Sequence, residues 1–252
     1  MDCQYPTIFA AFYDRIYHKI RDGVDNLFFL RHITEAKGKV LDAGVGTGRI
    51  FVEALINGVD IQGIDISSAM LDVLKSKIEP AQHARLSLQS ITNFKFDFKF
   101  GLVIAPFRVM MHVVEKEEQL AALNNVWKHL DTGGKFIFDA FVPNPLFLVN
   151  GLDNEVDFDE EYSPGKRIRR IVSTHPDLIN QIIHCHFRFE SIDNNTVECE
   201  DWDSPMRFFF RYELEHLIER SAFGVNYTIL GNYDSTPLST GSKEFIVICV
   251  KK

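Results

Sequence analysis

A glycine-rich stretch is the part of this sequence best suited to binding a ligand. It reads DAGVGTG over residues 42–48 and directly follows the apolar residues Val40 and Leu41. Glycines after a buried strand allow a tight turn into a helix, and the missing Cβ atoms let a ligand approach the backbone. A carboxylate such as that of Asp42, beside helix amides, suits a cationic amino-acid group held directly or through water. The stretch therefore predicts a small-molecule site at one edge of a sheet.

A second carboxylate, Asp65, ends the next predicted strand and lies 19 positions beyond Gly46 (65 − 46). At about 20 residues beyond such glycines, a carboxylate can accept hydrogen bonds from both hydroxyls of a ribose. The glycine stretch and Asp65 together therefore predict a ligand that contains adenosine.

Two other nucleotide motifs fit the sequence less well. A dinucleotide-binding fingerprint requires glycine at position 49, where this chain has Arg49, and no GxxxxGK[ST] string occurs anywhere. Two alternatives remain open, a nicotinamide-dependent oxidoreductase and a catalytically inert cofactor-binding or assembly module. Saturable NAD binding would indicate the first, and cofactor binding without turnover would indicate the second.

The stretch 42–48 followed by Asp65 resembles the class I S-adenosylmethionine-dependent methyltransferases, and the resemblance covers roughly residues 38–142. Residues 100–106 resemble the family's fourth-strand motif, and residues 130–135 its turn before the fifth strand. The resemblance implies S-adenosylmethionine as cofactor, S-adenosylhomocysteine as product, and methyl transfer to a nitrogen or oxygen atom of a small-molecule acceptor. It also implies cofactor contacts from Asp42, Ala43, Gly44, Gly46, Gly48, Asp65, Ile66, Ser90, Ile91, Ala105, Pro106 and Phe107. At position 90 the family often has an acidic residue, where this chain has serine.

Methyl transfer from a sulfonium is an in-line displacement, so a base that removes the acceptor's proton helps more than a nucleophilic side chain. His112 is the first candidate, because imidazole titrates near neutrality and the resemblance to amino-sugar and glycine N-methyltransferases places a histidine in this loop. Residues 12–17 resemble the YDxxY opening of the same enzymes, which implies a site role for Tyr13 and then for Tyr17. Helix packing is the alternative reading for His112 and for both tyrosines.

Arg108, Arg188 and Trp202 are further candidates for the acceptor pocket. Arg108 follows the fourth strand, and the other two lie in a segment where the resemblance implies an acceptor lid. No metal is expected, because His184 and His186 would share one face of a strand while Cys185 points to the other.

The periodicity of the chain predicts the α/β class. From residue 38 onward, short runs rich in β-branched residues alternate with helical segments, which is typical of βαβ units in a doubly wound sheet. The sheet is expected to have seven strands and to be mostly parallel. Strands are expected at Val40–Ala43, Val59–Ile64, Arg85–Leu88, Gly101–Ala105, Lys135–Phe141, Tyr227–Tyr233 and Glu244–Val250, with helices over Arg49–Asn57, Ser67–Ile78, Glu115–Leu130 and Arg211–Ser221.

Three parts are expected along the chain. Residues 1–37 form an N-terminal helical cap, with helices over Pro6–Arg21 and Asp25–Ala36, and residues 38–142 with 211–252 form the cofactor-binding core. Residues 143–210 form a small antiparallel sheet inserted after the fifth strand, with three strands and turns at 175–177 and 193–195. The inserted sheet is expected to be an acceptor lid or the surface of a homodimer.

The charge of the chain disfavours binding to nucleic acid, because the sequence has 27 Lys and Arg residues against 35 Asp and Glu residues, a net charge of -8. The basic cluster Lys166, Arg167, Arg169 and Arg170 is expected to pair with the acidic run over 153–161. No apolar run approaches the ~20 residues of a membrane span, no signal peptide is recognisable, and the four cysteines lack CxxC spacing. We therefore expect a cytoplasmic protein with reduced thiols and no membrane partner.

Overall fold

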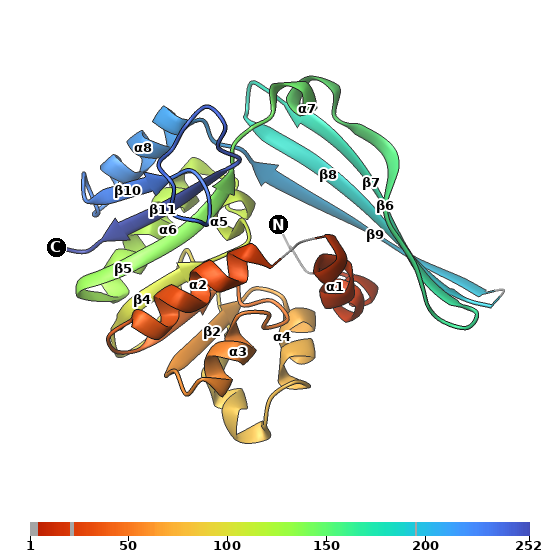
Figure 1. Ribbon diagram of the computed structural model, residues 1–252, viewed down its shortest axis with the longest axis horizontal. Coiled ribbons are helices and arrows are strands. Elements are labelled where there is room, and N and C mark those ends of the chain that lie inside the picture. The colour runs from red at the N-terminus through yellow and green to blue at the C-terminus, as the bar shows by residue number, and fades with distance from the viewer. Residues whose placement is uncertain (1–4, 21–22, 195) are drawn as a thin grey trace.

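The computed structural model describes residues 5–20, 23–194 and 196–252. Its centre is a seven-stranded sheet in the order β10-β11-β5-β4-β1-β2-β3, with helices on both faces (Figure 1). The strands are β1 (Val40–Ala43), β2 (Ile61–Asp65), β3 (Leu86–Leu88), β4 (Phe100–Ala105), β5 (Leu130–Phe141), β10 (Tyr227–Leu230) and β11 (Glu244–Val250). Only β11 runs antiparallel to its neighbours β5 and β10. The predicted fold class, a doubly wound and mostly parallel sheet, is confirmed.

Two apolar clusters attach the helices to the sheet. One face is covered by α2 (Val24–Glu35), α3 (Phe51–Ile56) and α4 (Ser68–Lys75), and the other by α6 (Lys116–His129) and α8 (Arg211–Arg220). Along β4, Leu102 and Ile104 join the first cluster while Val103 and Ala105 join the second. This alternation buries both faces of the strand, and it explains why the sequence of β4 is continuously apolar.

The start of α4 follows local capping chemistry. Ser67 precedes α4 as predicted, and its hydroxyl accepts a hydrogen bond from the Met70 N–H at 3.3 Å.

A 3₁₀ turn (Pro80–Arg85) leads into β3, and the short α5 (Val109–His112) follows β4. The first helix is α1 (Thr7–Ile20), and Arg21, the predicted end of that helix, lies outside the described residues.

The inserted sheet has four strands, so the prediction of three was wrong. The strands are β6 (Leu152–Ser163), β7 (Lys166–Asp177), β8 (Ile182–Asp193) and β9 (Thr196–Arg207), paired in this order and antiparallel, after the short α7 (Pro145–Asn150). The missed strand β6 is the acidic run, and three register irregularities against β7 interrupt its period of two. The predicted turn at 175–177 belongs to β7, and the turn follows at 178–181. Asn195, in the other predicted turn, lies outside the described residues.

The acidic run pairs with the basic cluster as the charge pattern predicts. Arg167 and Arg169 both form ion pairs with Asp159, and Arg170 binds both carboxylate oxygens of Asp157 at 2.8 and 2.7 Å. Lys166 differs, because it pairs with Asp193 at 3.0 Å.

The inserted sheet curves over α1, which lies between it and the seven-stranded sheet (Figure 1). The ring of Phe9 stacks on Phe189 at 4.6 Å and lies 5.3 Å from Trp202. At the start of α1, the Ile8 N–H donates to the Glu200 carboxylate at 2.7 Å. Two segments far apart in sequence are thereby joined above the carboxyl ends of β1 and β4.

Within the described parts of the chain, no helix combines the length and apolar composition that crossing a bilayer requires.

Candidate functional site

The turn after β1 is built from glycines in left-handed backbone conformations. Their φ angles are +78° at Gly44, +54° at Gly46 and +85° at Gly48. A Cβ atom would come within 2.3 Å of Val109 at Gly44 and within 2.2 Å of Leu74 at Gly48, whereas nothing lies within 4 Å of that position at Gly46. Close packing therefore requires Gly44 and Gly48, while Gly46 leaves backbone open to a ligand.

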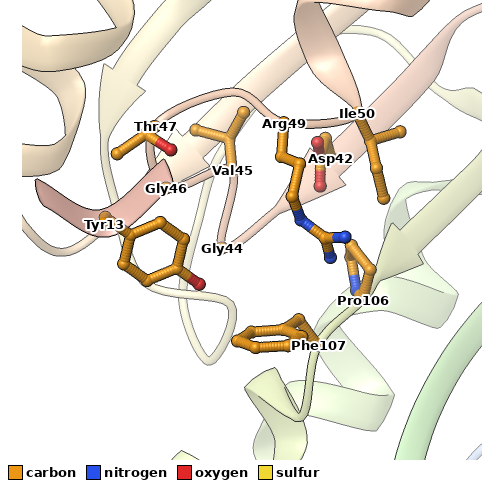
Figure 2. A pocket seen from close by; sticks show the side chains of 10 residues that line it. All are labelled: Tyr13, Asp42, Gly44, Val45, Gly46, Thr47, Arg49, Ile50, Pro106 and Phe107. Atoms are coloured by element: carbon orange, nitrogen blue, oxygen red, sulfur yellow. The ribbon is translucent and has the colours of Figure 1, made fainter. Parts of the chain in front are cut away.

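A pocket that is partly open to solvent lies beside this turn (Figure 2). It lies where the chain leaves β1 and β4 in opposite directions, the switch point at which open α/β sheets bind ligands. Three elements contribute to it, namely α1, the turn after β1 and the turn after β4. The lining residues are Tyr13, Asp42, Gly44, Val45, Gly46, Thr47, Arg49, Ile50, Pro106 and Phe107. Six of them, Tyr13, Asp42, Gly44, Gly46, Pro106 and Phe107, are residues that the sequence predicts for the site.

Asp42 is buried, with 1% of its surface exposed, and its Oδ1 has no hydrogen-bond partner among the described residues. Burial and the negative charge of Asp65 raise the pKa of Asp42 to about 7, and the Arg49 charge partly opposes this rise. A buried carboxylate without a partner is costly unless a cation or donor binds it. Asp42 therefore fits a ligand with an ammonium group.

Asp65 is oriented by the turn itself. Its Oδ2 accepts a hydrogen bond from the Gly46 N–H and its Oδ1 one from the Ser67 N–H, both at 2.8 Å. Burial raises the pKa of Asp65, and the backbone N–H groups of Ser67, Gly46 and Ile66 oppose that rise. Because each carboxylate oxygen can accept more than one hydrogen bond, Asp65 can stabilise the turn and also accept hydrogen bonds from ribose hydroxyls.

The turn after β4 contains two consecutive residues in the left-handed region, with φ of +59° at Phe107 and +69° at Arg108. The fully buried Asp139 stabilises this turn, because its Oδ1 accepts the Arg108 N–H at 2.6 Å and its Oδ2 accepts the Tyr233 hydroxyl. Such backbone strain in residues other than glycine is concentrated at functional sites. The sequence offers no motif for Asp139, which reads there as one polar residue in an apolar strand.

Phe107 and Arg108 point to different surroundings. The Phe107 ring lines the pocket and lies 4.8 Å from the ring of Tyr17 and 6.3 Å from that of Tyr13. The Arg108 guanidinium instead donates to Glu244 at 2.7 Å and lies over the Phe141 ring. Arg108, predicted for the acceptor, is therefore turned toward β5 and β11 and does not line the pocket.

The two predicted tyrosines take different positions. Burial, followed by the neighbouring Tyr17, raises the pKa of Tyr13 well above its usual value, so the Tyr13 hydroxyl keeps its proton and can donate a hydrogen bond. Tyr17 lies next to it, with ring centroids 4.6 Å apart. The Tyr17 hydroxyl accepts a hydrogen bond from Arg170 at 3.1 Å, so it connects α1 to the inserted sheet rather than lining the pocket.

His112 ends α5 beneath the inserted sheet. Its Nδ1 lies 3.4 Å from the Ser204 hydroxyl of β9, and it is not among the lining residues. Burial, with a smaller contribution from the Arg108 charge, lowers the pKa of His112 to about 4. The imidazole is therefore neutral at physiological pH, as a proton acceptor must be, although it is a weak one.

The remaining predicted cofactor residues do not line the pocket. Ala43 and Ala105 are fully buried at the ends of β1 and β4, and Gly48 packs against α4. Ile66 is half exposed beside Asp65, and Ile91 is buried. Ser90 shapes its own turn, since its hydroxyl accepts the Thr92 N–H at 3.2 Å.

The two candidates from the inserted sheet lie on opposite faces of it. Arg188 is half exposed and pairs with Asp201 at 3.2 Å, on the face of β8 that points away from the buried Phe189. The structure therefore does not bring Arg188 to the pocket, because side chains alternate along a strand. Trp202 lies on the inner face and packs on Phe9 and on Phe187, at 5.5 Å from the latter ring.

Sequence reasoning missed four lining residues, Val45, Thr47, Arg49 and Ile50. Thr47 is bound to α1, because its hydroxyl donates to Asp14 at 2.6 Å, and Lys77 pairs with Asp14 and donates to the Thr47 carbonyl at 2.7 Å. Arg49 could have been found from its position directly after the glycines. That position was used above only to exclude a dinucleotide-binding fingerprint. Over the described ranges, no three His, Cys, Asp or Glu side chains gather in a way that could hold a metal ion.

Comparison with known proteins places this site in context. Residues 40–134 match the model of a methyltransferase domain family. The chain is 24% identical over 204 residues to malonyl-[acyl-carrier protein] O-methyltransferase 1 of Ilyobacter polytropus, an alignment that covers 79% of this chain and 70% of that protein. It spans between 52% and 57% of the length of three further curated relatives.

Solved structures share the fold over nearly the whole chain. An S-adenosylmethionine-dependent methyltransferase from Clostridium acetobutylicum superposes with a TM-score of 0.75, at 19% identity and over 97% of this chain and 98% of that one. The sugar N-methyltransferase KedS8 from Streptoalloteichus gives a TM-score of 0.73 at 16% identity, over 95% and 92% of the two chains. At these identities, the likeness to solved structures establishes the fold alone.

Proposed function

We propose that this protein transfers a methyl group from S-adenosylmethionine to a nitrogen or oxygen atom of a small-molecule acceptor. Residues 40–134 match the model of a methyltransferase domain family, and the chain shares the fold of a solved S-adenosylmethionine-dependent methyltransferase, which supports the proposal. The observation that carries the proposal is the buried Asp42, whose Oδ1 lacks a partner among the described residues beside the open backbone of Gly46.

The chemistry of the pocket fits the two ends of this cofactor. Its methionine portion carries an ammonium group, which the Asp42 carboxylate would bind by a charge-assisted hydrogen bond. The ribose of the cofactor carries two hydroxyls. Asp65 would accept hydrogen bonds from both, while it keeps its hydrogen bonds from the Gly46 and Ser67 N–H groups. Ile66 and the segment at Ser90 and Ile91 follow the neighbouring strands β2 and β3, and we assign them to the adenine end.

When bound, the sulfonium supplies an activated methyl group, and the residues of the chain align the acceptor and exclude water. The inserted sheet and α1 together cover the edge of the sheet where this transfer would occur (Figure 1). We assign the protonated Tyr13 hydroxyl as a hydrogen-bond donor in the pocket. We assign His112 as proton acceptor through Nε2, because its Nδ1 faces Ser204.

Of two similar proteins, the structural neighbour KedS8 is named for a sugar acceptor and the curated relative from Ilyobacter polytropus for an acyl group carried on a protein. The first is named for N-methylation and the second for O-methylation, so both nucleophiles remain in the proposal. We also propose a cytoplasmic location, which the unpaired Cys185, Cys199 and Cys249 support. A homodimer through the inserted sheet stays a prediction.

The experiment that tests the function has two stages. Calorimetry first measures binding of S-adenosylhomocysteine and of NAD to the full chain, and we expect only the former to bind. Purified protein and S-adenosylmethionine are then incubated with a panel of amines, carboxylic acids, phenols and amino sugars, and release of S-adenosylhomocysteine is measured. NAD binding without cofactor binding would indicate the oxidoreductase, and cofactor binding with no release across the panel would indicate the inert module.

A further inference from the structure

We infer that Asp139 is a positioning residue for the pocket, and that it holds the Phe107 ring in place through the backbone of Arg108. The inference rests on the proposed function and adds to that site a residue that does not line the pocket. It also gives the segment after β10 a part in ligand binding, because the Tyr233 hydroxyl of that segment donates to Asp139.

The end of β4 explains why the turn after it needs an acceptor from another strand. Ala105 is the last residue of β4 and lies opposite Phe138 of β5. The next residue, Pro106, has no N–H, so it cannot donate a further hydrogen bond to β5. The Arg108 N–H donates instead to the side chain of Asp139, the residue after Phe138, at 2.6 Å. The carboxylate thus fastens the chain to β5 beyond the end of the strand pairing.

The fastened turn has a backbone that its residues rarely adopt. An aromatic and a long charged side chain stand at φ angles of +59° (Phe107) and +69° (Arg108), in the left-handed region that favours glycine. Such a conformation persists where the surrounding structure determines it. Without the acceptor at position 139, the Arg108 N–H would lose this hydrogen bond in a buried place, and the turn could relax.

The conformation of the turn decides where the Phe107 ring lies. The ring lines the pocket across from Gly44 and Gly46 in Figure 2. On the other side of Arg108, Val109 packs so closely against Gly44 that a Cβ there would come within 2.3 Å of it. A change of the backbone at residues 107 and 108 would therefore turn the ring out of the pocket and disturb the contact with the glycine turn.

Asp139 is itself held in one orientation. Its Oδ1 accepts from Arg108 and its Oδ2 from the Tyr233 hydroxyl, and the ring of Tyr233 lies 5.8 Å from the ring of Phe28 in α2. The neighbouring Phe138 and Ala140 are fully buried, as Asp139 is. Packing of this strand does not require an acid, because an apolar side chain of similar shape would fill the same space. The turn that Asp139 holds gives the acid its purpose.

The test compares two substitutions that keep the branched shape of the side chain. Asp139→Asn keeps an oxygen that can accept the Arg108 N–H, and its amide can donate to the Tyr233 hydroxyl. Asp139→Leu has no acceptor. In Asp139→Leu we expect the Arg108 amide to exchange about 10-fold faster or more and S-adenosylhomocysteine to bind about 10-fold more weakly, as for a lost hydrogen bond to a charged group. Asp139→Asn should restore both quantities to within about 3-fold of the original protein. Hydrogen exchange by NMR and calorimetry on the full chain provide the measurements.

A double-mutant cycle distinguishes positioning of Phe107 from a general loss of structure. Phe107→Ala removes the ring, so adding Asp139→Leu to it should change the Kd of S-adenosylhomocysteine by less than about 2-fold further. Asp131→Leu makes the same chemical change at an exposed position of β5, and it should alter neither the exchange nor the Kd. Tyr233→Phe removes a single hydroxyl and should give a smaller loss in the same direction, which serves if Asp139→Leu does not fold.

The outcomes separate the inference from the proposed function. If the original protein does not bind S-adenosylhomocysteine, the proposed function fails, and the role of Asp139 in it fails as well. If Asp139→Leu binds as tightly as the original protein, the inference is overturned while cofactor binding stands. An equal loss of affinity with and without the Phe107 ring would show that Asp139 serves the fold alone, and it would also overturn the inference.

Discussion

At the scale of single residues, Asp42 fits the proposed ligand and does not serve the stability of the fold. It is buried beside a second acid, and burial raises its pKa to about 7. An acid whose pKa is higher in the folded state stabilises the protein below its unfolded pKa, and this stabilisation is lost as the pH rises through the folded pKa. The wild-type protein should therefore lose stability between about pH 4 and pH 7 on account of this one group.

Asp42→Asn tests this view, because it removes the buried charge and keeps the shape of the side chain. At pH 8 we expect the free energy of unfolding of the variant to exceed that of the original protein by on the order of 2 to 4 kcal/mol. The gain should shrink toward pH 4, where the folded acid is already neutral. Denaturant melts at both pH values provide the measurement, and calorimetry should show weaker binding of S-adenosylhomocysteine. A variant that is less stable at pH 8 would contradict the assignment of Asp42 as an unpaired buried acid.

His112 makes a prediction about pH dependence as well as rate. Because burial lowers its pKa to about 4, the imidazole is neutral from pH 6 to pH 8, and it should add no pH dependence to the rate in that range. His112→Ala should reduce kcat about 10- to 100-fold with little change in the Kd of S-adenosylhomocysteine, since a base acts in the transition state. Steady-state rates with the identified acceptor provide the test, and His216→Ala on the exposed face of α8 is the control. An undiminished rate removes His112 as the base.

At the scale of elements, different glycines of the turn after β1 serve packing and the proposed binding of the cofactor. Gly46 and Gly58 share a left-handed backbone, and at both positions an added Cβ would have no atom within 4 Å, but only Gly46 lines the pocket. We expect Gly46→Ala and Gly58→Ala each to cost about 1 kcal/mol of stability through backbone strain. Only Gly46→Ala should weaken binding of S-adenosylhomocysteine, by about 10-fold or more. Thermal melts and calorimetry measure both effects, and equal affinities would show that the ligand does not approach Gly46.

The elements that the sequence predicts well are those with a local signal. The strands β1, β4 and β11 are largely apolar, and the turn at 42–48 needs glycines, so composition and spacing were enough to place Asp42 and Gly46 at one sheet edge. Strand β6 was missed because its bulges break the alternation that identifies a strand and because its acidic residues resemble a solvated run. Asp139 was missed because one buried carboxylate in a strand acquires meaning only when the backbone of Arg108 is brought to it.

At the scale of the whole molecule, the inserted sheet is connected to the pocket through α1. Arg170 is almost fully buried, binds Asp157 and donates to the Tyr17 hydroxyl, while Asp14 on the same helix accepts from Thr47 of the glycine turn. The helix is thus bonded on one side to the insertion and on the other to the pocket. The sequence could suggest a lid only by resemblance, because the contact from Arg170 to Tyr17 spans 153 positions.

Arg170→Met tests this connection, because methionine keeps an apolar stem and removes the donors. We expect faster amide exchange across α1 and a roughly 3- to 10-fold weaker affinity for S-adenosylhomocysteine, with unchanged exchange in β1 and β4. Arg167→Met is the matched control, since Arg167 pairs with Asp159 on the exposed side of the same strand. Hydrogen exchange that is identical in the two variants would show that α1 is held independently of Arg170.

The contact between Ile8 and Glu200 can form only late in the synthesis of the chain, because it joins positions 192 residues apart. A ribosome that adds about 5 to 20 residues each second needs roughly 10 to 40 s to synthesise that interval. During that time α1 has already emerged but has neither Phe189 nor Trp202 to pack against. A nascent chain can therefore begin to pair β1, β2 and β4 before α1 has its packing partners, and the covering of the pocket by α1 becomes a late event in the maturation of each molecule.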